Sequence, residues 1–205
     1  MSNTQQEITR TSMWSPLGYP AFRTIWIAVT ISNTGTWMHD MGVGWLMATM
    51  TDSSFMVALV QTATTLPFFL LALPAGTLAD IVDRRTFLLF TFIWMMLSAA
   101  LLGILTLTDY TTPWILLILT FSLGVGNAMM RPALSASVPG LVPREELRKA
   151  ITLNSMSLNV SRSVGPVLAG LLVMSAGPAY VFLLNALTFL AIMYAVYCWP
   201  RNIDA

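Results

Sequence analysis

Six apolar stretches follow one another along the chain, and each is about as long as a bilayer is thick. The hydrocarbon core of a bilayer measures about 30 Å and needs about 20 helical residues to cross it. This pattern predicts an all-α integral membrane protein with six transmembrane helices. The expected helices cover residues 22–49, 54–79, 86–108, 113–138, 147–174 and 178–199.

The composition fits a membrane protein better than a soluble one. Of 205 residues, 56% are hydrophobic and 9% are charged, whereas soluble domains carry about 25% charged residues. The net charge of +1 and the lack of a basic docking motif exclude a nucleic-acid partner. The single cysteine, Cys198, and the single histidine, His39, cannot form a Cys/His zinc site. We therefore expect a lipid bilayer as partner, no metal and no cofactor.

The placement of basic residues predicts the orientation of the chain. Short connectors make neighbouring helices antiparallel, which gives one bundle over residues 21–200. Cytoplasmic loops are enriched in lysine and arginine, so the basic side is expected to face the cytoplasm of a cell (inner) membrane. Residues 1–20 would then form a cytoplasmic tail, residues 201–205 would begin a cytoplasmic loop, and both termini would be cytoplasmic. The basic residues on this side are Arg10, Arg23, Arg84, Arg85, Arg144, Arg148, Lys149 and Arg201.

One face of the first expected helix carries polar residues. Asn33, Trp37 and Asp40 recur at helical spacing and share this face. A carboxylate inside a membrane is costly unless it is paired or hydrated, so Asp40 is a candidate for proton or substrate coupling in a water-filled cavity. The alternative is a structural residue, paired or hydrated on the outer side. His39 is one position off this face, where a packed, neutral ring is expected.

Two arginines lie inside later helices and also require partners. Arg162 is near the middle of the fifth expected helix and shares a face with Asn159. We hypothesise that Arg162 and Asp40 belong to one polar cavity; a purely structural link between helices is the alternative. Arg131, in the fourth expected helix, is at the membrane level of Asp80, and an ion pair between them is predicted.

The segment Gly76–Arg85, GTLADIVDRR, resembles the signature between the second and third helices of the major facilitator superfamily. The resemblance implies a conformational latch made by Gly76, Asp80, Arg84 and Arg85 together with Arg131. In the family the aspartate pairs with the arginine of the fourth helix and with a facing helix N-terminus. Asp83 stands where the family usually has the glycine before the basic pair.

Gly165, Pro166 and Gly170 in the fifth expected helix resemble an exporter-associated signature, with Ala169 in place of one glycine. The same spacing suggests close helix approach. The surrounding sequence is similar to enterobactin-type exporters and macrolide efflux proteins. This resemblance implies a secondary active transporter that exports a small molecule, such as a siderophore or drug, by proton antiport and alternating access. The fold would be one half of a transporter, a 3+3 inverted repeat, with a second six-helix half as partner.

An intramembrane enzyme and a subunit that does not transport are the alternatives to a transporter. An intramembrane serine protease would need a Gly-x-Ser nucleophile and a later histidine, and a metalloprotease would need His-Glu-x-x-His. The sequence contains neither Gly-x-Ser nor His-Glu-x-x-His, so no enzyme is expected. A truncated or half-size membrane subunit that does not transport by itself and needs a second half remains the alternative.

Overall fold

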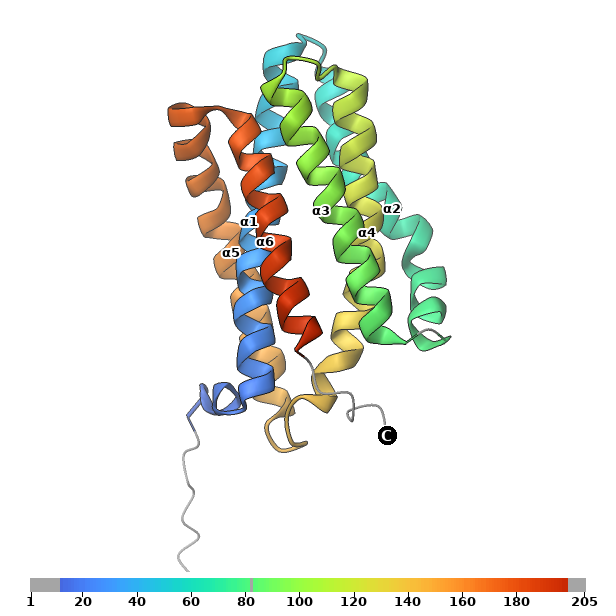
Figure 1. Cartoon of the computed structure of the whole chain (residues 1–205), viewed down its shortest axis with the longest axis vertical. Coiled ribbons are helices and arrows are strands. Elements are labelled where there is room, and N and C mark those ends of the chain that lie inside the picture. The colour runs from blue at the N-terminus through green and yellow to red at the C-terminus, as the bar shows by residue number, and fades with distance from the viewer. Residues whose placement is uncertain (1–11, 82, 199–205) are drawn as a thin grey trace, which may run out of the picture.

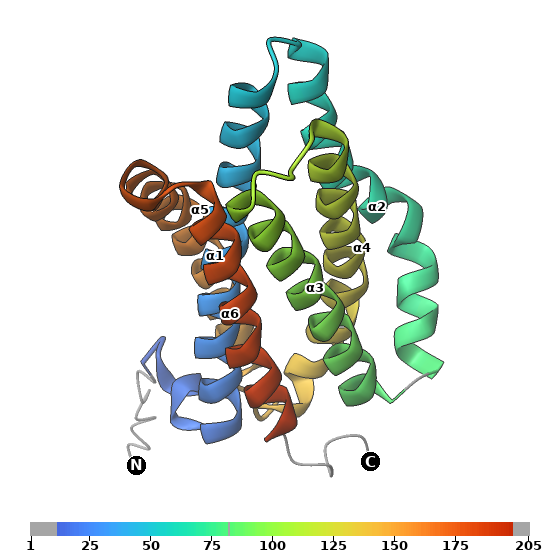
Figure 2. The same cartoon turned by 45° about the horizontal axis from the view of Figure 1, so that its top comes forward.

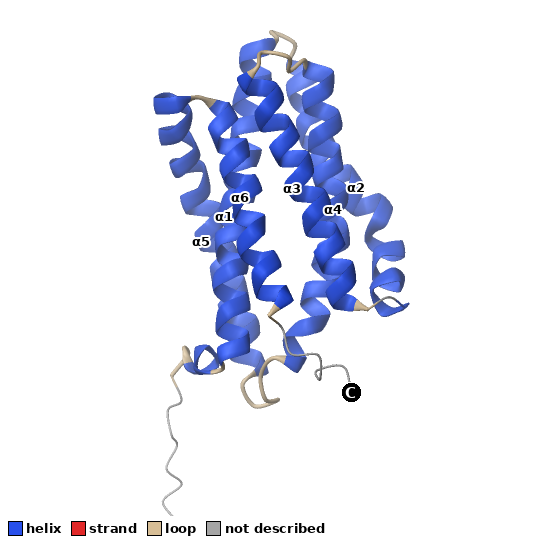
Figure 3. Cartoon of the chain, viewed as in Figure 1, coloured by secondary structure: helices blue, strands red, loops and turns tan. Residues whose placement is uncertain are grey.

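The computed structural model describes residues 12–81 and 83–198, with the side chains of the second long helix described for residues 54–71 and 74. Helices and loops, without strands, make up this part of the chain (Figures 1 and 3). Two short 3-10 helices, η1 (Ser15–Gly18) and η2 (Val138–Gly140), accompany the long helices. The six long helices are α1 (Pro20–Met50), α2 (Ser54–Ile81), α3 (Arg84–Leu107), α4 (Pro113–Ser137), α5 (Leu147–Ala176) and α6 (Pro178–Tyr197).

Each long helix begins and ends within two residues of the range expected from the sequence. The predicted all-helical fold is therefore confirmed. In the described residues, five helices, α2 to α6, contain a stretch that is long and apolar enough to cross a membrane. Although α1 has 31 residues, it is not among these five, and its sequence includes His39 and Asp40. The crossing of the membrane by α1 therefore stays a prediction.

Local sequence signals explain where several helices begin and end. Asp83 caps α3, because its Oδ1 accepts a hydrogen bond from the backbone N–H of Thr86 at 2.8 Å. Prolines open α1, α4 and α6, where the missing N–H has no helical partner to lose. Gly177 separates α5 from α6 with φ of 98°, a left-handed conformation that favours glycine.

The long helices form two groups, and the most extensive contact between the groups is that of α3 with α6 (Figures 1 and 2). In one group α1 packs against α5 and α6, and in the other α4 packs against α2 and α3. The groups join where α3 packs along α6. Contacts between α1 and α4 are few, so space for a cavity is left between these two helices.

Two large apolar clusters hold the groups together. The larger cluster includes Phe92 and Phe189, whose ring centroids are 6.3 Å apart across α3 and α6. The second, here called the apolar plug, joins the C-terminal parts of α1 and α3 to the N-terminal parts of α2, α4 and α6. It consists of Val43, Met47, Val60, Ala63, Leu102, Leu116, Leu117 and Phe182.

Hydroxyl groups link α1 to α5 along a contact here called the α1–α5 seam. Thr30 Oγ1 and Ser157 Oγ are 2.6 Å apart, and one turn further Thr34 Oγ1 donates to Ser161 Oγ at 3.0 Å. Ser161 Oγ also donates to the backbone carbonyl of Thr30 at 3.2 Å. These bonds satisfy polar groups that would otherwise face an apolar environment.

The seam continues at Gly165, where the backbone of α5 lies directly against α1. A Cβ at this position would lie 2.6 Å from Trp37 Cβ, so no larger residue fits without movement. Ala169, one turn later, is fully buried. Gly170, by contrast, has no atom within 4 Å of a Cβ built on it. Close approach to α1 therefore involves Gly165 and Ala169, whereas a Cβ on Gly170 would meet no described atom, and the role of Gly170 stays a prediction.

Candidate functional site

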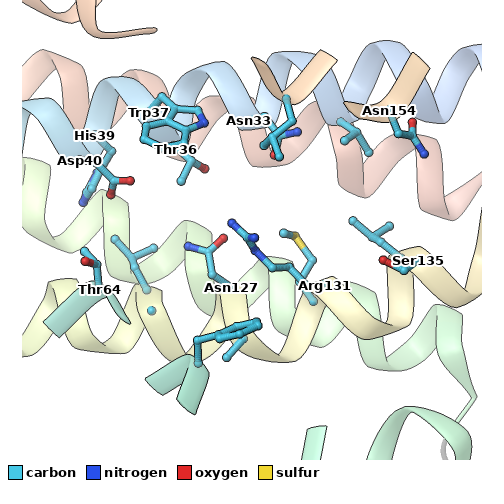
Figure 4. A pocket seen from close by; sticks show the side chains of 18 of the residues that line it. Asn33, Thr36, Trp37, His39, Asp40, Thr64, Asn127, Arg131, Ser135 and Asn154 are labelled. Carbon is cyan, nitrogen blue, oxygen red and sulfur yellow. The ribbon is translucent and has the colours of Figure 1, made fainter. Parts of the chain in front are cut away.

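A cavity of about 620 Å³ lies between α1 and α4, with further lining from α2 and α5 (Figure 4). Pockets of roughly 300–1,000 Å³ hold small organic molecules in other proteins. Its walls combine apolar and aromatic side chains with polar groups from all four helices. The polar lining includes Asn33, Asp40, Thr64, Asn127, Arg131 and Asn154.

The α1 wall contains the three residues that helical spacing placed on one face. Asn33, Trp37 and Asp40 all line the cavity, and Figure 4 shows them along the α1 side of it. His39 also lines the cavity but is almost fully buried, and its ring packs on Phe182 with centroids 4.8 Å apart. The candidate polar face of α1 is therefore the α1 wall of the cavity.

The α4 wall carries a positively charged side chain opposite Asp40. Asn127 and Arg131 are one turn apart and line the cavity opposite α1 (Figure 4). Arg131 and Asp40 carry opposite charges on opposite walls of this cavity. Two opposite charges therefore share one cavity within a largely apolar bundle, which reduces the cost of each charge.

Arg162 and Asn159 do not line this cavity as the structure describes it. Both are exposed: the guanidinium of Arg162 lies 5.3 Å from the ring centroid of Trp37, and Asn159 Nδ2 donates to the carbonyl of Ser155. The reason is the orientation of α5, which turns fully buried Ser161 toward α1 and its neighbour Arg162 outward. Arg131 thus takes the place expected for Arg162 beside Asp40.

The basic pair at the start of α3 binds the C-terminal ends of two other helices. Arg84 Nη1 donates to the carbonyl of Ala136 in the last turn of α4 at 3.1 Å. Arg85 donates to the carbonyl of Tyr197, the last residue of α6, and its guanidinium is 5.0 Å from the Tyr197 ring centroid. Cations near helix C-termini are favourable because they satisfy free carbonyls and the helix dipole.

Two members of the expected latch are outside the described side chains. Gly76 and Asp80 fall in the last two turns of α2, where the structure describes the helix but not the side chains. The ion pair between Asp80 and Arg131 therefore stays a prediction. Arg131 itself lies on the cavity wall opposite Asp40.

Comparison with known families agrees with this arrangement. The sequence profile of a major facilitator family, described as transmembrane secretion effector, matches residues 11–205. The chain belongs to the major facilitator superfamily. Together with the apolar helices, this makes it a multi-pass membrane protein of a transporter family.

Curated relatives of this major facilitator protein include a siderophore transporter, a drug exporter and a siderophore exporter by name. It is 27% identical over 170 residues to the staphyloferrin A transporter of Staphylococcus aureus, covering 82% of this chain and 42% of that protein. Macrolide efflux protein A of Streptococcus pyogenes is 26% identical over 151 residues, covering 74% of this chain and 37% of that protein. The enterobactin exporter EntS of Shigella boydii is 29% identical over 185 residues, covering 85% of this chain and 42% of that protein. The chain thus spans less than half the length of these relatives.

Some residues of this major facilitator protein were not found by reasoning from the sequence. Thr64 and Thr120 line the cavity from α2 and α4, but single threonines in apolar helices carry no positional signal. The α1–α5 seam could have been predicted from the sequence, because small residues recur at every fourth position of α5. They are Ser157, Ser161, Gly165 and Ala169.

Proposed function

We propose that this chain is the amino-terminal half of a secondary active transporter that exports a small molecule, such as a siderophore or a drug. The observation that carries the proposal is the cavity of about 620 Å³ with Asp40 and Arg131 on its walls. Charged residues inside a membrane bundle mark substrate or ion pathways. The names of the relatives supply the substrate classes.

The packing supports a 3+3 inverted repeat, in which α1, α2 and α3 correspond to α4, α5 and α6. Under this correspondence the contacts of α1 with α5 and α6 become those of α4 with α2 and α3, and both sets are present. The contact of α3 with α6 maps onto itself. The arrangement requires α1 to cross the membrane, and its polar residues support this because they face the cavity or the α1–α5 seam instead of lipid.

Exposed polar groups on α5 support a second six-helix half as partner. Arg162 lies in the middle of α5 and is exposed in this chain. At the centre of a lipid bilayer an arginine costs at least about 2.5–3.5 kcal/mol. Of the five apolar spans, those of α2 and α5 are also the least buried, at 17% and 28% against 44–50% for the other three. A second bundle against α2 and α5 would cover this face, and rocking of the two bundles gives alternating access.

The helix-end contacts support an orientation with both termini in the cytoplasm of a cell (inner) membrane. Lys149 Nζ donates to Ser15 Oγ at 3.1 Å and to Glu146 at 3.1 Å, which fixes η1 to the start of α5. Arg84 and Arg85 bind the C-terminal ends of α4 and α6. The basic residues therefore gather at one end of the bundle, as the positive-inside rule requires of a cytoplasmic face.

Asp40 is the proposed coupling residue for proton antiport. It faces the cavity, and Arg131 carries the opposite charge on the opposite wall. A carboxylate in this setting can exchange a proton or a substrate contact as the cavity opens to either side. The alternative, a half-size subunit that needs another half before it transports, predicts the same cavity but no efflux by this chain alone.

Efflux measurements test the proposal. Cells that lack their own exporters would express the chain alone, or with the carboxy-terminal half of a related exporter, and efflux of a labelled macrolide and a labelled siderophore would be followed. We expect efflux with both halves present, and loss of efflux when the proton gradient is collapsed or when Asp40→Asn is introduced. Asp52→Asn, in the exposed loop before α2, is the matched control and should retain efflux. Efflux that survives both Asp40→Asn and collapse of the gradient would contradict the proposal.

A further inference from the structure

Two buried side chains on the cavity wall have polar atoms that lack hydrogen-bond partners among the described residues. They are both ring nitrogens of His39 and the hydroxyl of Thr120. Each residue is 2% exposed, and each lines the cavity from a different helix, α1 or α4. Buried polar groups in native proteins are nearly always hydrogen-bonded, so unpaired ones next to a cavity indicate a missing partner.

These unpaired groups lie at the same end of the cavity, next to the apolar plug. His39 precedes the plug residue Val43 by four positions in α1, and Thr120 follows the plug residue Leu116 by four positions in α4. Four positions are about one helical turn, so both side chains lie one turn to the cavity side of the plug. Thr64 of α2 is placed in the same way, and Figure 4 shows it across the cavity from His39.

The hydrogen-bonding capacity of this layer selects one kind of ligand group. The His39 ring packs on Phe182 of the plug, and a neutral imidazole has one donor and one acceptor. The Thr120 hydroxyl likewise donates and accepts. An ammonium group would leave both donors unmatched, and a carboxylate would leave both acceptors unmatched. A hydroxyl group, which donates and accepts, can satisfy either residue.

We propose that the plug end of the cavity is a subsite for an uncharged, hydroxyl-bearing part of the transported molecule, bound by His39 and Thr120. The inference rests on the proposed function, because it assigns this cavity to the substrate. Water also donates and accepts, and it fills the cavity of about 620 Å³ when no substrate is bound; a hydroxyl group can replace such a water because it reproduces the same hydrogen bonds. The volume of the cavity is that of pockets that hold small organic molecules.

Binding of four small benzene derivatives to the whole chain in lipid nanodiscs tests the subsite without requiring transport. Phenol donates and accepts, anisole accepts only, benzoate is an anion and benzylammonium is a cation. Saturation-transfer NMR titrations would give the affinity of each, after subtraction of the signal from empty nanodiscs. We expect phenol to bind about tenfold more tightly than anisole, which is the effect of one hydrogen bond to a buried group, and more tightly than either ion.

Variants assign the effect to the two residues. His39→Leu and Thr120→Val remove the polar groups, and each should bring phenol affinity down to that of anisole. His39→Gln keeps one donor and one acceptor and should restore part of the phenol preference. Thr49→Val is the matched control, because Thr49 is exposed in α1, donates to the carbonyl of Leu46 and does not line the cavity.

The possible results separate this inference from the proposed function. Equal binding of phenol and anisole, stronger binding of benzoate or benzylammonium, or phenol binding unchanged in both polar-group variants would each overturn the subsite. None of these results would decide whether the chain takes part in export, which the efflux measurement tests. The second measurement is the thermal unfolding temperature of the protein without ligand. Thr120→Val should not lower this temperature, because the Thr120 hydroxyl has no hydrogen-bond partner among the described residues. A marked decrease would show that the hydroxyl is bonded within the protein and would contradict the inference.

Discussion

Replacement of Gly165 by alanine tests how closely α5 approaches α1. The added Cβ would lie 2.6 Å from Trp37 Cβ and 3.1 Å from the carbonyl oxygen of Thr34. Non-bonded carbon atoms need about 3.5–4.0 Å, so the two helices must separate by about 1 Å. Added atoms in a well-packed interior cost about 1–3 kcal/mol.

Separation of the helices would also weaken the hydroxyl bonds of the α1–α5 seam. The pairs Thr30–Ser157 and Thr34–Ser161 are worth about 0.6 kcal/mol each on the average for bonds between membrane helices. The total loss in free energy of unfolding is therefore about 2–4 kcal/mol. For a chain of this size each kcal/mol shifts Tm by about 2–4 °C, which predicts a decrease of about 4–16 °C.

Gly170→Ala is the matched control, since it makes the same chemical change in the same helix with no atom within 4 Å of the new Cβ. Both variants gain helix propensity, up to about 1 kcal/mol, so the difference between them isolates the contact. Thermal unfolding of each purified variant in detergent, followed by circular dichroism, gives the comparison. If Gly165→Ala melts at the same temperature as Gly170→Ala, the close approach of α5 to α1 is refuted.

Three further predictions concern the ends and the interior of the bundle. Asp83→Ala should lower the free energy of unfolding by about 1 kcal/mol, because it removes the cap of α3; an unchanged unfolding midpoint would show that the cap contributes nothing. A double-mutant cycle with Thr30→Val and Ser157→Ala should give a coupling energy of about 0.6 kcal/mol, and strict additivity would argue against the bond. Arg131→Ala should lower the yield of folded protein more than the double variant Asp40→Asn/Arg131→Ala does, because the single change leaves the Asp40 carboxylate in the cavity without an opposing positive charge; equal yields from the single and double variants would show that the two charges do not compensate each other.

The sequence determined the positions of the helices well because membrane helices have a strong and simple signal. Each apolar stretch has the length that a bilayer requires, and prolines or capping residues mark several starts. The polar face of α1 was also predictable, since Asn33, Trp37 and Asp40 repeat at helical spacing and a helix has a fixed period.

The partners of these residues could not be predicted in the same way. Which arginine lies opposite Asp40 depends on how α4 and α5 are rotated about their axes, and a chain with two intramembrane arginines leaves this open. The structure places Arg131 on the cavity and turns Arg162 outward, because the small residues of α5 face α1. The unpaired groups of His39 and Thr120 could not be found from sequence, since pairing is a property of the packed bundle.

The central claim is that a polar, water-accessible cavity lies between α1 and α4 inside an otherwise lipid-facing bundle. Cysteine accessibility in a Cys198→Ser background tests it most directly, with Asn127→Cys on the cavity wall and Leu97→Cys in the middle of α3, where the side chain is 59% exposed and apolar. In membranes, a charged, water-soluble thiol reagent should modify the cysteine at position 127 and leave the one at position 97 unmodified. Modification at position 97 with protection at position 127 would contradict the account.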